Sequence, residues 1–143
     1  RLLELSKKEL IRLIDYLSLY DLCAELRQIV ETKILKKIYS FLSDEQRNVL
    51  KQISNRKEVH PIPRLGLERW DGMEESLRIL LHKRGLARLG LALSGQDSDL
   101  IWSICHHLDI GRGGALFKLC AKEPMADLSA AAIHQVEESL SLL

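Results

Sequence analysis

The chain has 143 residues, of which 46% are hydrophobic and 29% charged, with 21 Lys and Arg against 20 Asp and Glu. This composition is typical of globular chains and excludes an intrinsically disordered one. The formal net charge of +1 leaves no basic excess, so neither nucleic acid nor an anionic lipid surface is expected as a partner.

No apolar run approaches the ~20 residues that a membrane-spanning helix needs, and no signal peptide opens the chain, so we expect no direct membrane insertion. The three cysteines, Cys23, Cys105 and Cys120, have no paired spacing. An odd, unpaired set indicates buried thiols in a reducing compartment, and we interpret the protein as cytoplasmic. Because the first residue is Arg1 rather than Met, we expect a piece of a longer protein.

Apolar residues recur at helical spacing along most of the chain, and no segment shows the two-residue alternation of a strand, which predicts an all-α fold. In the first half, S-K-K-E at 6–9 and S-D-E-Q at 43–46 are capping boxes, in which side chains bond the free amides of a helix start. Further helix starts are expected at Asp21 and at about Thr32. Residues 6–54 are therefore predicted as four short helices, each stabilised by packing on its neighbours.

The helical pattern breaks at 55–72, where Pro61 and Pro63 enforce an extended backbone. No sustained apolar stripe crosses this segment. We interpret it as a linker between two helical subdomains, 1–54 and 73–143.

The second subdomain is predicted to begin with a helix at Met73–Lys83, followed by a joint at Gly85 and a short apolar helix at 86–95. Asp97 or Ser98 is expected to cap the next helix. Two more amphipathic helices are expected to complete the chain.

One stretch of the second subdomain combines Cys105, His106 and His107 with the tetrad Gly111-Arg112-Gly113-Gly114. A structural zinc site needs four ligands in paired spacings, whereas adjacent histidines on a helix point roughly 100° apart. A phosphate-binding loop needs a preceding strand and a lysine–hydroxyl pair, and both are missing. We therefore predict no metal and no cofactor. Instead we expect one surface histidine, one packed histidine, a buried thiol, and a corner at which small residues let two helices approach closely.

No catalytic constellation is evident in the sequence. The chain has no G-x-S-x-G elbow, and no cysteine lies in an exposed electropositive setting. Neighbouring acids such as Glu137 and Glu138 fall on polar helix faces. We therefore predict that the protein is not an enzyme and has no catalytic residues.

The second half also contains a series of motifs in a recognisable order. L-G-L-A-L-S-G at Leu89–Gly95 is followed by His107-Leu108-Asp109, by Arg112-Gly113-Gly114 and by Pro124-Met125. These are similar to L-A-L-A-L-K-G, to N-M-S-x-R-A-A with one residue inserted, and to P-V. Through these motifs, Asp71–Leu143 resembles the C-terminal domain of the bacterial flagellar motor switch protein FliG.

The first half is similar in style to the FliG middle domain and to the cytoplasmic domain of MgtE-type magnesium transporters. The linker at 55–72 occupies the place of the FliG hinge. The resemblance implies stacked short helices arranged as armadillo-like, FliG-like superhelical subdomains.

In the FliG family, the helix before L-A-L-A-L-K-G carries charges that contact the stator. Counting back from Gly95 places this helix at Met73–Arg84. Several charges are reversed relative to the family pattern, which would weaken contact with an unchanged partner, so torque generation is not expected. The residues that the resemblance implies in partner binding are Glu74, Glu75, Arg78, Lys83 and Arg84.

The resemblance to FliG implies a non-enzymatic cytoplasmic scaffold in a ring or platform beneath a flagellar or type III secretion basal body. Its expected partners are basal-body or secretion-ring proteins and further copies of the chain, and a partner would hold it at the inner-membrane face. Two alternatives remain open. One is a generic helical adaptor that shares only the fold with FliG, and the other is an Mg²⁺-sensing regulatory domain like that of MgtE.

Overall fold

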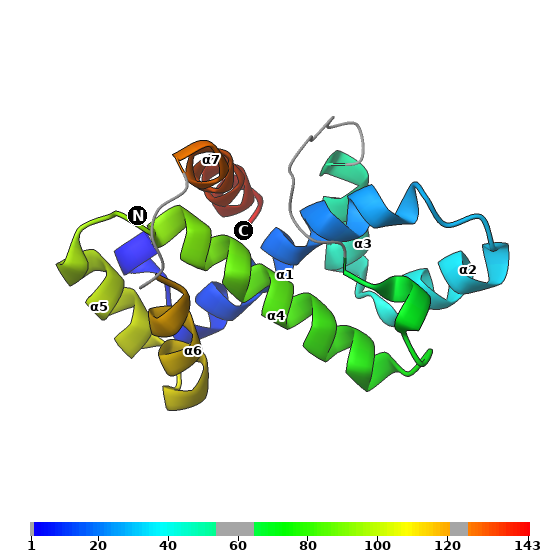
Figure 1. Ribbon diagram of the computed structural model, residues 1–143, viewed down its shortest axis with the longest axis horizontal. Coiled ribbons are helices and arrows are strands. Elements are labelled where there is room, and N and C mark those ends of the chain that lie inside the picture. Colours follow the sequence, from blue (N-terminus) through cyan, green and yellow to red (C-terminus); the bar gives the residue numbers. More distant parts are fainter. Residues whose placement is uncertain (1, 54–64, 121–125) are drawn as a thin grey trace.

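The computed structural model describes residues 2–53, 65–120 and 126–143 (Figure 1). Over these residues the chain forms seven α-helices, two short 3₁₀ turns and no strand, which confirms the predicted all-α fold. The elements in chain order are η1 (Leu2–Glu4), α1 (Lys7–Leu26), α2 (Thr32–Phe41), α3 (Asp44–Ile53), η2 (Leu67–Arg69), α4 (Glu74–Leu93), α5 (Ser98–His107), α6 (Ile110–Cys120) and α7 (Ala126–Leu142).

Helix α1 begins at the first predicted capping box but does not end where the sequence indicated. The Glu9 amide donates to Ser6 Oγ at 3.2 Å, and the Ser6 amide donates to Glu9 Oε1 at 3.1 Å. The expected helix start at Asp21 is wrong, because α1 continues without a break to Leu26. Asp21 instead pairs with arginines of α4, so its carboxylate serves a tertiary contact and residues 6–53 form three helices rather than four.

Helix α4 is likewise continuous over 20 residues, so the joint predicted at Gly85 is wrong. A Cβ at Gly85 would overlap the carbonyl oxygen of Ile14 on α1. At Gly90, a Cβ would lie 2.7 Å from the Leu119 Cβ on α6. Both glycines are therefore places where other helices cross α4 closely, and their small size reflects packing rather than a chain break.

The two long helices, α1 and α4, organise the interior. In Figure 1 they run through the middle of the molecule, with α2 and α3 at one end and α5 and α6 at the other. One buried cluster joins the first half of α1 to the second half of α4 and to α5, α6 and α7. The other joins the second half of α1 to α2, α3 and the first half of α4.

Both clusters contain residues from each side of the predicted linker at 55–72. Residues 55–64 of this linker lie outside the described residues. After them, Leu65 and Leu67 are buried in the second cluster. The division into subdomains 1–54 and 73–143 stays a prediction, while the described packing runs across it.

The remaining local predictions are mixed. The second capping box opens α3, and Asp97 caps α5 by accepting from the Asp99 amide at 3.4 Å, as predicted. Helices α2, α3, α5 and α6 are short, at 10 or 11 residues, whereas α1 and α4 are about twice that length.

In the described part of the chain, none of the helices combines the length and apolar character needed to cross a bilayer.

The close crossing at Gly85 is testable by substitution. We expect Gly85→Ala to lower the free energy of unfolding by about 1–3 kcal/mol, because α1 must move away from the new methyl group. Urea unfolding followed by far-UV circular dichroism measures this change. Gly114→Ala is the matched control, since nothing lies within 4 Å of a Cβ there, and alanine should stabilise α6 by up to ~1 kcal/mol. Equal unfolding midpoints for the two variants would contradict the crossing.

Candidate functional site

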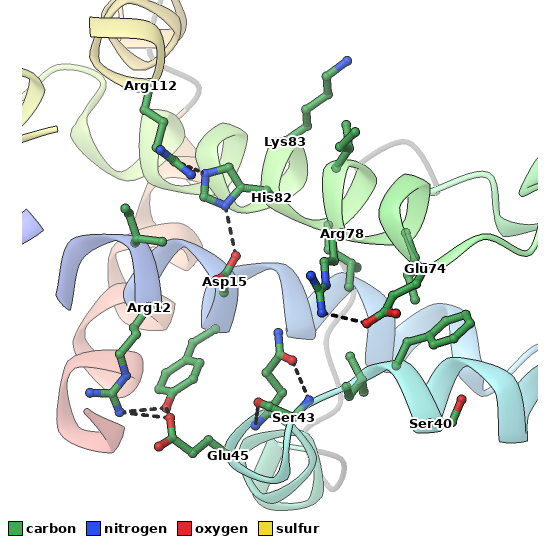
Figure 2. Close-up of a pocket in the computed structure, with 18 residues that line it drawn as sticks. Arg12, Asp15, Ser40, Ser43, Glu45, Glu74, Arg78, His82, Lys83 and Arg112 are labelled. Atoms are coloured by element: carbon green, nitrogen blue, oxygen red, sulfur yellow. Dashed lines mark hydrogen bonds and ion pairs between the residues drawn. The ribbon is translucent and has the colours of Figure 1, made fainter. Parts of the chain in front are cut away.

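A groove of about 800 Å³ lies between α1 and α4 and is bounded by the turn between α2 and α3 (Figure 2). Arg112 of α6 contributes to one end of it. The lining mixes apolar side chains, among them Ile11, Phe41 and Ile79, with charged groups of both signs. Helices α1, α2, α3, α4 and α6 and the α2–α3 turn therefore meet at a single open surface.

The turn between α2 and α3 is fixed by its capping box. The Ser43 amide donates to Gln46 Oε1 at 2.9 Å, and the Gln46 amide donates to Ser43 Oγ at 3.1 Å. Arg47 then closes back onto α2, its Nε donating to the Tyr39 carbonyl at 2.8 Å. These local bonds hold Phe41 against the groove.

The start of α4 is positioned by a short network around Trp70. Its ring meets Phe41 edge-to-face at 6.1 Å between centroids, and its Nε1 donates to the Met73 carbonyl at 3.0 Å. Asp71 accepts from the Ser76 hydroxyl and from the Met73 amide, and these bonds, the hydroxyl first, lower the pKa of Asp71. The first turn of α4 is thereby set next to the α2–α3 turn.

The structure brings three of the five predicted partner-binding residues to this groove. Glu74 and Arg78 line it and form an ion pair, with 2.7 Å between Glu74 Oε1 and Arg78 Nη2. Lys83 is also in the lining, and its side chain projects from α4 away from His82 and Arg78 (Figure 2). Glu75 is exposed but lies outside the lining.

Arg84 does not share this surface. Its side chain is only 14% exposed and lies 3.5 Å from Asp21 Oδ1. Arg88, one turn further along α4, is 3% exposed and pairs with the same carboxylate at 2.6 and 2.9 Å. Both arginines thus serve the contact between α1 and α4.

A second polar cluster lies on the wall formed by α1 and α3. Arg12 Nη2 donates to the Tyr16 hydroxyl at 3.1 Å and lies 3.4 Å from Glu45 Oε2. The Tyr16 hydroxyl in turn donates to Glu45 at 3.4 Å. The Glu45 carboxylate is therefore occupied by a cation and a hydroxyl from α1.

A chain of hydrogen bonds crosses the groove from α1 to α6 through His82 (Figure 2). His82 Nδ1 lies 3.0 Å from Asp15 Oδ1, and Arg112 Nε donates to His82 Nε2 at 2.8 Å. Since a guanidinium can only donate, Nε2 must be the acceptor, which assigns the ring proton to Nδ1. Arg112 Nη1 continues to Asp109 at 2.7 Å.

Sequence reasoning missed this chain. Asp15 and His82 are 67 residues apart, and no local motif links them. In the sequence, Arg112 belongs to the glycine-rich tetrad and to the motif similar to R-A-A, and neither pattern indicates a contact with His82. Its guanidinium lowers the pKa of Asp109 to about 2, mainly through the side-chain hydrogen bond.

The histidine and glycine stretch forms a helix–helix contact. The corner predicted at the glycine tetrad is wrong, because these residues lie within α6 rather than between two helices. The predicted close approach is present at Gly113, where a Cβ would overlap the Cys105 carbonyl oxygen of α5. The expected packed histidine is wrong. Both His106 and His107 are exposed, and their Nδ1 atoms bond the carbonyls of Trp102 and Ser103 at 2.7 Å.

In the described ranges, no three His, Cys, Asp or Glu side chains converge in a way that could hold a metal ion. The three cysteines are buried and are thiols rather than disulfides. Burial raises the pKa of Cys105, and burial followed by the proximity of Cys105 raises the pKa of Cys120 to about 11. Thiolate, the reactive form, is thus scarce at these two positions near neutral pH.

The influence of Arg112 on Asp109 predicts a specific titration. Because the pKa of Asp109 is about 2 in the folded chain and about 4 in an unfolded one, its ionised carboxylate stabilises the fold above pH ~4. This contribution is lost as the pH falls through the folded pKa. We expect Arg112→Gln to raise the pKa of Asp109 toward ~4 in an NMR titration of the carboxyl carbon.

Lys7→Gln is the control for this titration. Lys7 Nζ lies 3.9 Å from the same carboxylate but makes no hydrogen bond with it. The pKa of Asp109 should therefore stay low in that variant. A low pKa in Arg112→Gln would show that Arg112 is not its cause.

The buried thiols predict slow chemical labelling. In native buffer near neutral pH, a thiol-reactive dye should label none of the three cysteines, and all three should react after unfolding. Ala115→Cys supplies an exposed thiol on α6 and should be labelled at once in the folded protein. Rapid native labelling of Cys105 or Cys120, mapped by mass spectrometry, would contradict the burial.

No family model, curated protein sequence or solved structure matches the chain. The likeness to FliG therefore rests on the sequence motifs and stays a prediction, as does the armadillo-like character of the helix arrangement.

Proposed function

We propose that this chain is a non-enzymatic helical interaction domain that docks a protein partner in the groove between α1 and α4. The observation that supports this most strongly is the composition of the groove. It offers exposed apolar surface at Ile79, which is 52% exposed, beside the charged pair Glu74–Arg78. Apolar contact area with flanking charges is the usual make-up of a protein–protein interface.

The chemistry of the groove favours binding over catalysis. His82 has both ring nitrogens engaged, by Asp15 and by Arg112, so it has no free acceptor for a substrate proton. The hydroxyls of Ser40 and Ser43 are used in bonds to the backbone of α2 and α3. Within the described lining, no hydroxyl or thiol is hydrogen-bonded to a histidine, which is the arrangement that an activated nucleophile requires.

The finer form of the proposal follows the resemblance to FliG. On that reading the domain belongs to a cytoplasmic ring or platform beneath a flagellar or type III secretion basal body, at the inner-membrane face. Its partners would be basal-body proteins and further copies of the chain. A generic helical adaptor with another partner is the alternative, and it would use the same groove.

A photocrosslinking amino acid at position 79 tests the proposal in the source cell. We expect it to give a discrete adduct with a basal-body or secretion-ring protein, identified by mass spectrometry, because Ile79 lies in the groove and is exposed. The same group at Lys118, exposed on α6 and outside the groove, should not give that adduct. An adduct with an unrelated protein would support the adaptor alternative, and none at position 79 would contradict docking.

A further inference from the structure

We propose that the occupant of the groove is an amphipathic helix whose apolar stripe is flanked by Asp or Glu residues. This inference rests on the proposed docking function and specifies the chemistry of the partner. It is drawn from three properties of the groove, namely its excess of positive charge, its exposed apolar surface and its volume.

The three carboxylates of the groove are already paired with donors of the same chain. Glu74 pairs with Arg78, Glu45 pairs with Arg12 and Tyr16, and Asp15 accepts from His82. Each of these acids therefore has a donor within hydrogen-bond or ion-pair distance. The groove thus offers no unpaired carboxylate among these three to attract a basic partner.

The cations are in excess. Arg12, Arg78, Lys83 and Arg112 outnumber the three lining carboxylates Asp15, Glu45 and Glu74. Behind the lining, Asp109 offsets Arg112, but Lys7 lies beside Asp109 and preserves the excess.

Specific donors are left without acceptors. Lys83 is exposed and forms no hydrogen bond or ion pair with any described residue. The Nε of Arg12 is buried and has no hydrogen-bond partner within the described part of the chain. That Nε is closed off from solvent, so Lys83 is the donor that a ligand carboxylate can reach from the groove. Charge complementarity therefore favours an acidic occupant.

Apolar contact accompanies this charge. Ile79 is the largely exposed apolar member of the lining, and Lys83 lies one helical turn beyond it on α4. Phe41 and Ile11 add half-buried apolar surface on the opposite walls. An occupant with one apolar stripe and acids at its edge would meet both kinds of surface at once.

The volume of the groove is sufficient for a helix. Two turns of an α-helix, taken as a cylinder 10 Å wide, occupy roughly 850 Å³. A groove of about 800 Å³ that takes half of the helix cross-section would hold about four turns, or about 14 residues. Docking of an apolar helix face between helices is an established mode of peptide recognition.

The test uses a displayed library of helical peptides about 14 residues long, with a fixed apolar stripe and Glu, Gln or Lys at the flanking positions. Selection on the folded protein should enrich Glu at these positions. NMR chemical-shift changes for an enriched peptide should centre on Ile79 and Phe41. Enrichment of Lys or Gln, absence of enrichment, or shifts centred elsewhere would overturn the inference.

Two matched pairs of variants sharpen the test. Glu74→Gln releases Arg78 and should tighten binding of the enriched peptide roughly threefold, whereas Glu75→Gln, the same change outside the lining, should not. Lys83→Glu should weaken binding roughly threefold or more, and Lys118→Glu should leave it unchanged. A loss of binding in Glu74→Gln, or equal effects within each pair, would overturn the inference, because a merely structural role for these residues would not strengthen binding.

The test of the acidic occupant can fail while the proposed docking function holds, and the two failures are distinguishable. If the crosslink at position 79 identifies a partner segment that is basic or uncharged, the acidic occupant is wrong and docking stands. If position 79 gives no adduct in the cell, docking fails whatever the library selects.

Discussion

The crossing of α1 over α4 is the contact on which the rest of the structure depends. At its centre the backbone of Gly85 lies against the carbonyl of Ile14, which brings the two helices closer than any side chain would permit. Alongside it, Asp21 of α1 holds Arg84 and Arg88 of α4 in a largely buried ion cluster. A buried charge is tolerated only when it is paired, so this cluster sets the register of the two helices as well as their distance.

That register determines what each end of the molecule can form. At one end, the second half of α1 and the first half of α4 receive α2 and α3, and the groove opens between them. At the other end, α5, α6 and α7 cover the remaining halves. Because α4 reaches from one cluster to the other without a break, the groove is built partly by a residue from the far end, Arg112 of α6.

Local signals in the sequence predicted local structure well. Both capping boxes and the cap at Asp97 are present, since such bonds join residues two or three positions apart and need no tertiary partner. The interruptions predicted at Asp21 and Gly85 are wrong for the complementary reason. Both residues contact a neighbouring helix, Asp21 through arginines of α4 and Gly85 through the backbone of α1. The local sequence pattern carries no information about such a contact.

The error at Gly85 also hid the position of Arg84. Once α4 is continuous, Leu77, Leu81, Arg84 and Arg88 follow each other at spacings of four, three and four, which places them on one inward-facing stripe of a helix. With a joint at Gly85 this stripe ends early, and Arg84 is taken for a surface residue. The bonds of His82 had no comparable signal, because its two partners come from helices far away in the sequence.

The bridge from Asp15 through His82 to Arg112 gives the groove a mechanical property. Arg112 is held at the groove by His82 and anchored behind it by Asp109, next to the first turn of α6. An occupant that drew this guanidinium toward itself would have to break one of these two bonds. Part of the binding free energy would then be used to displace α6 from its position against the other helices. A contact made at one end of the molecule would in this way strain the packing at the other end.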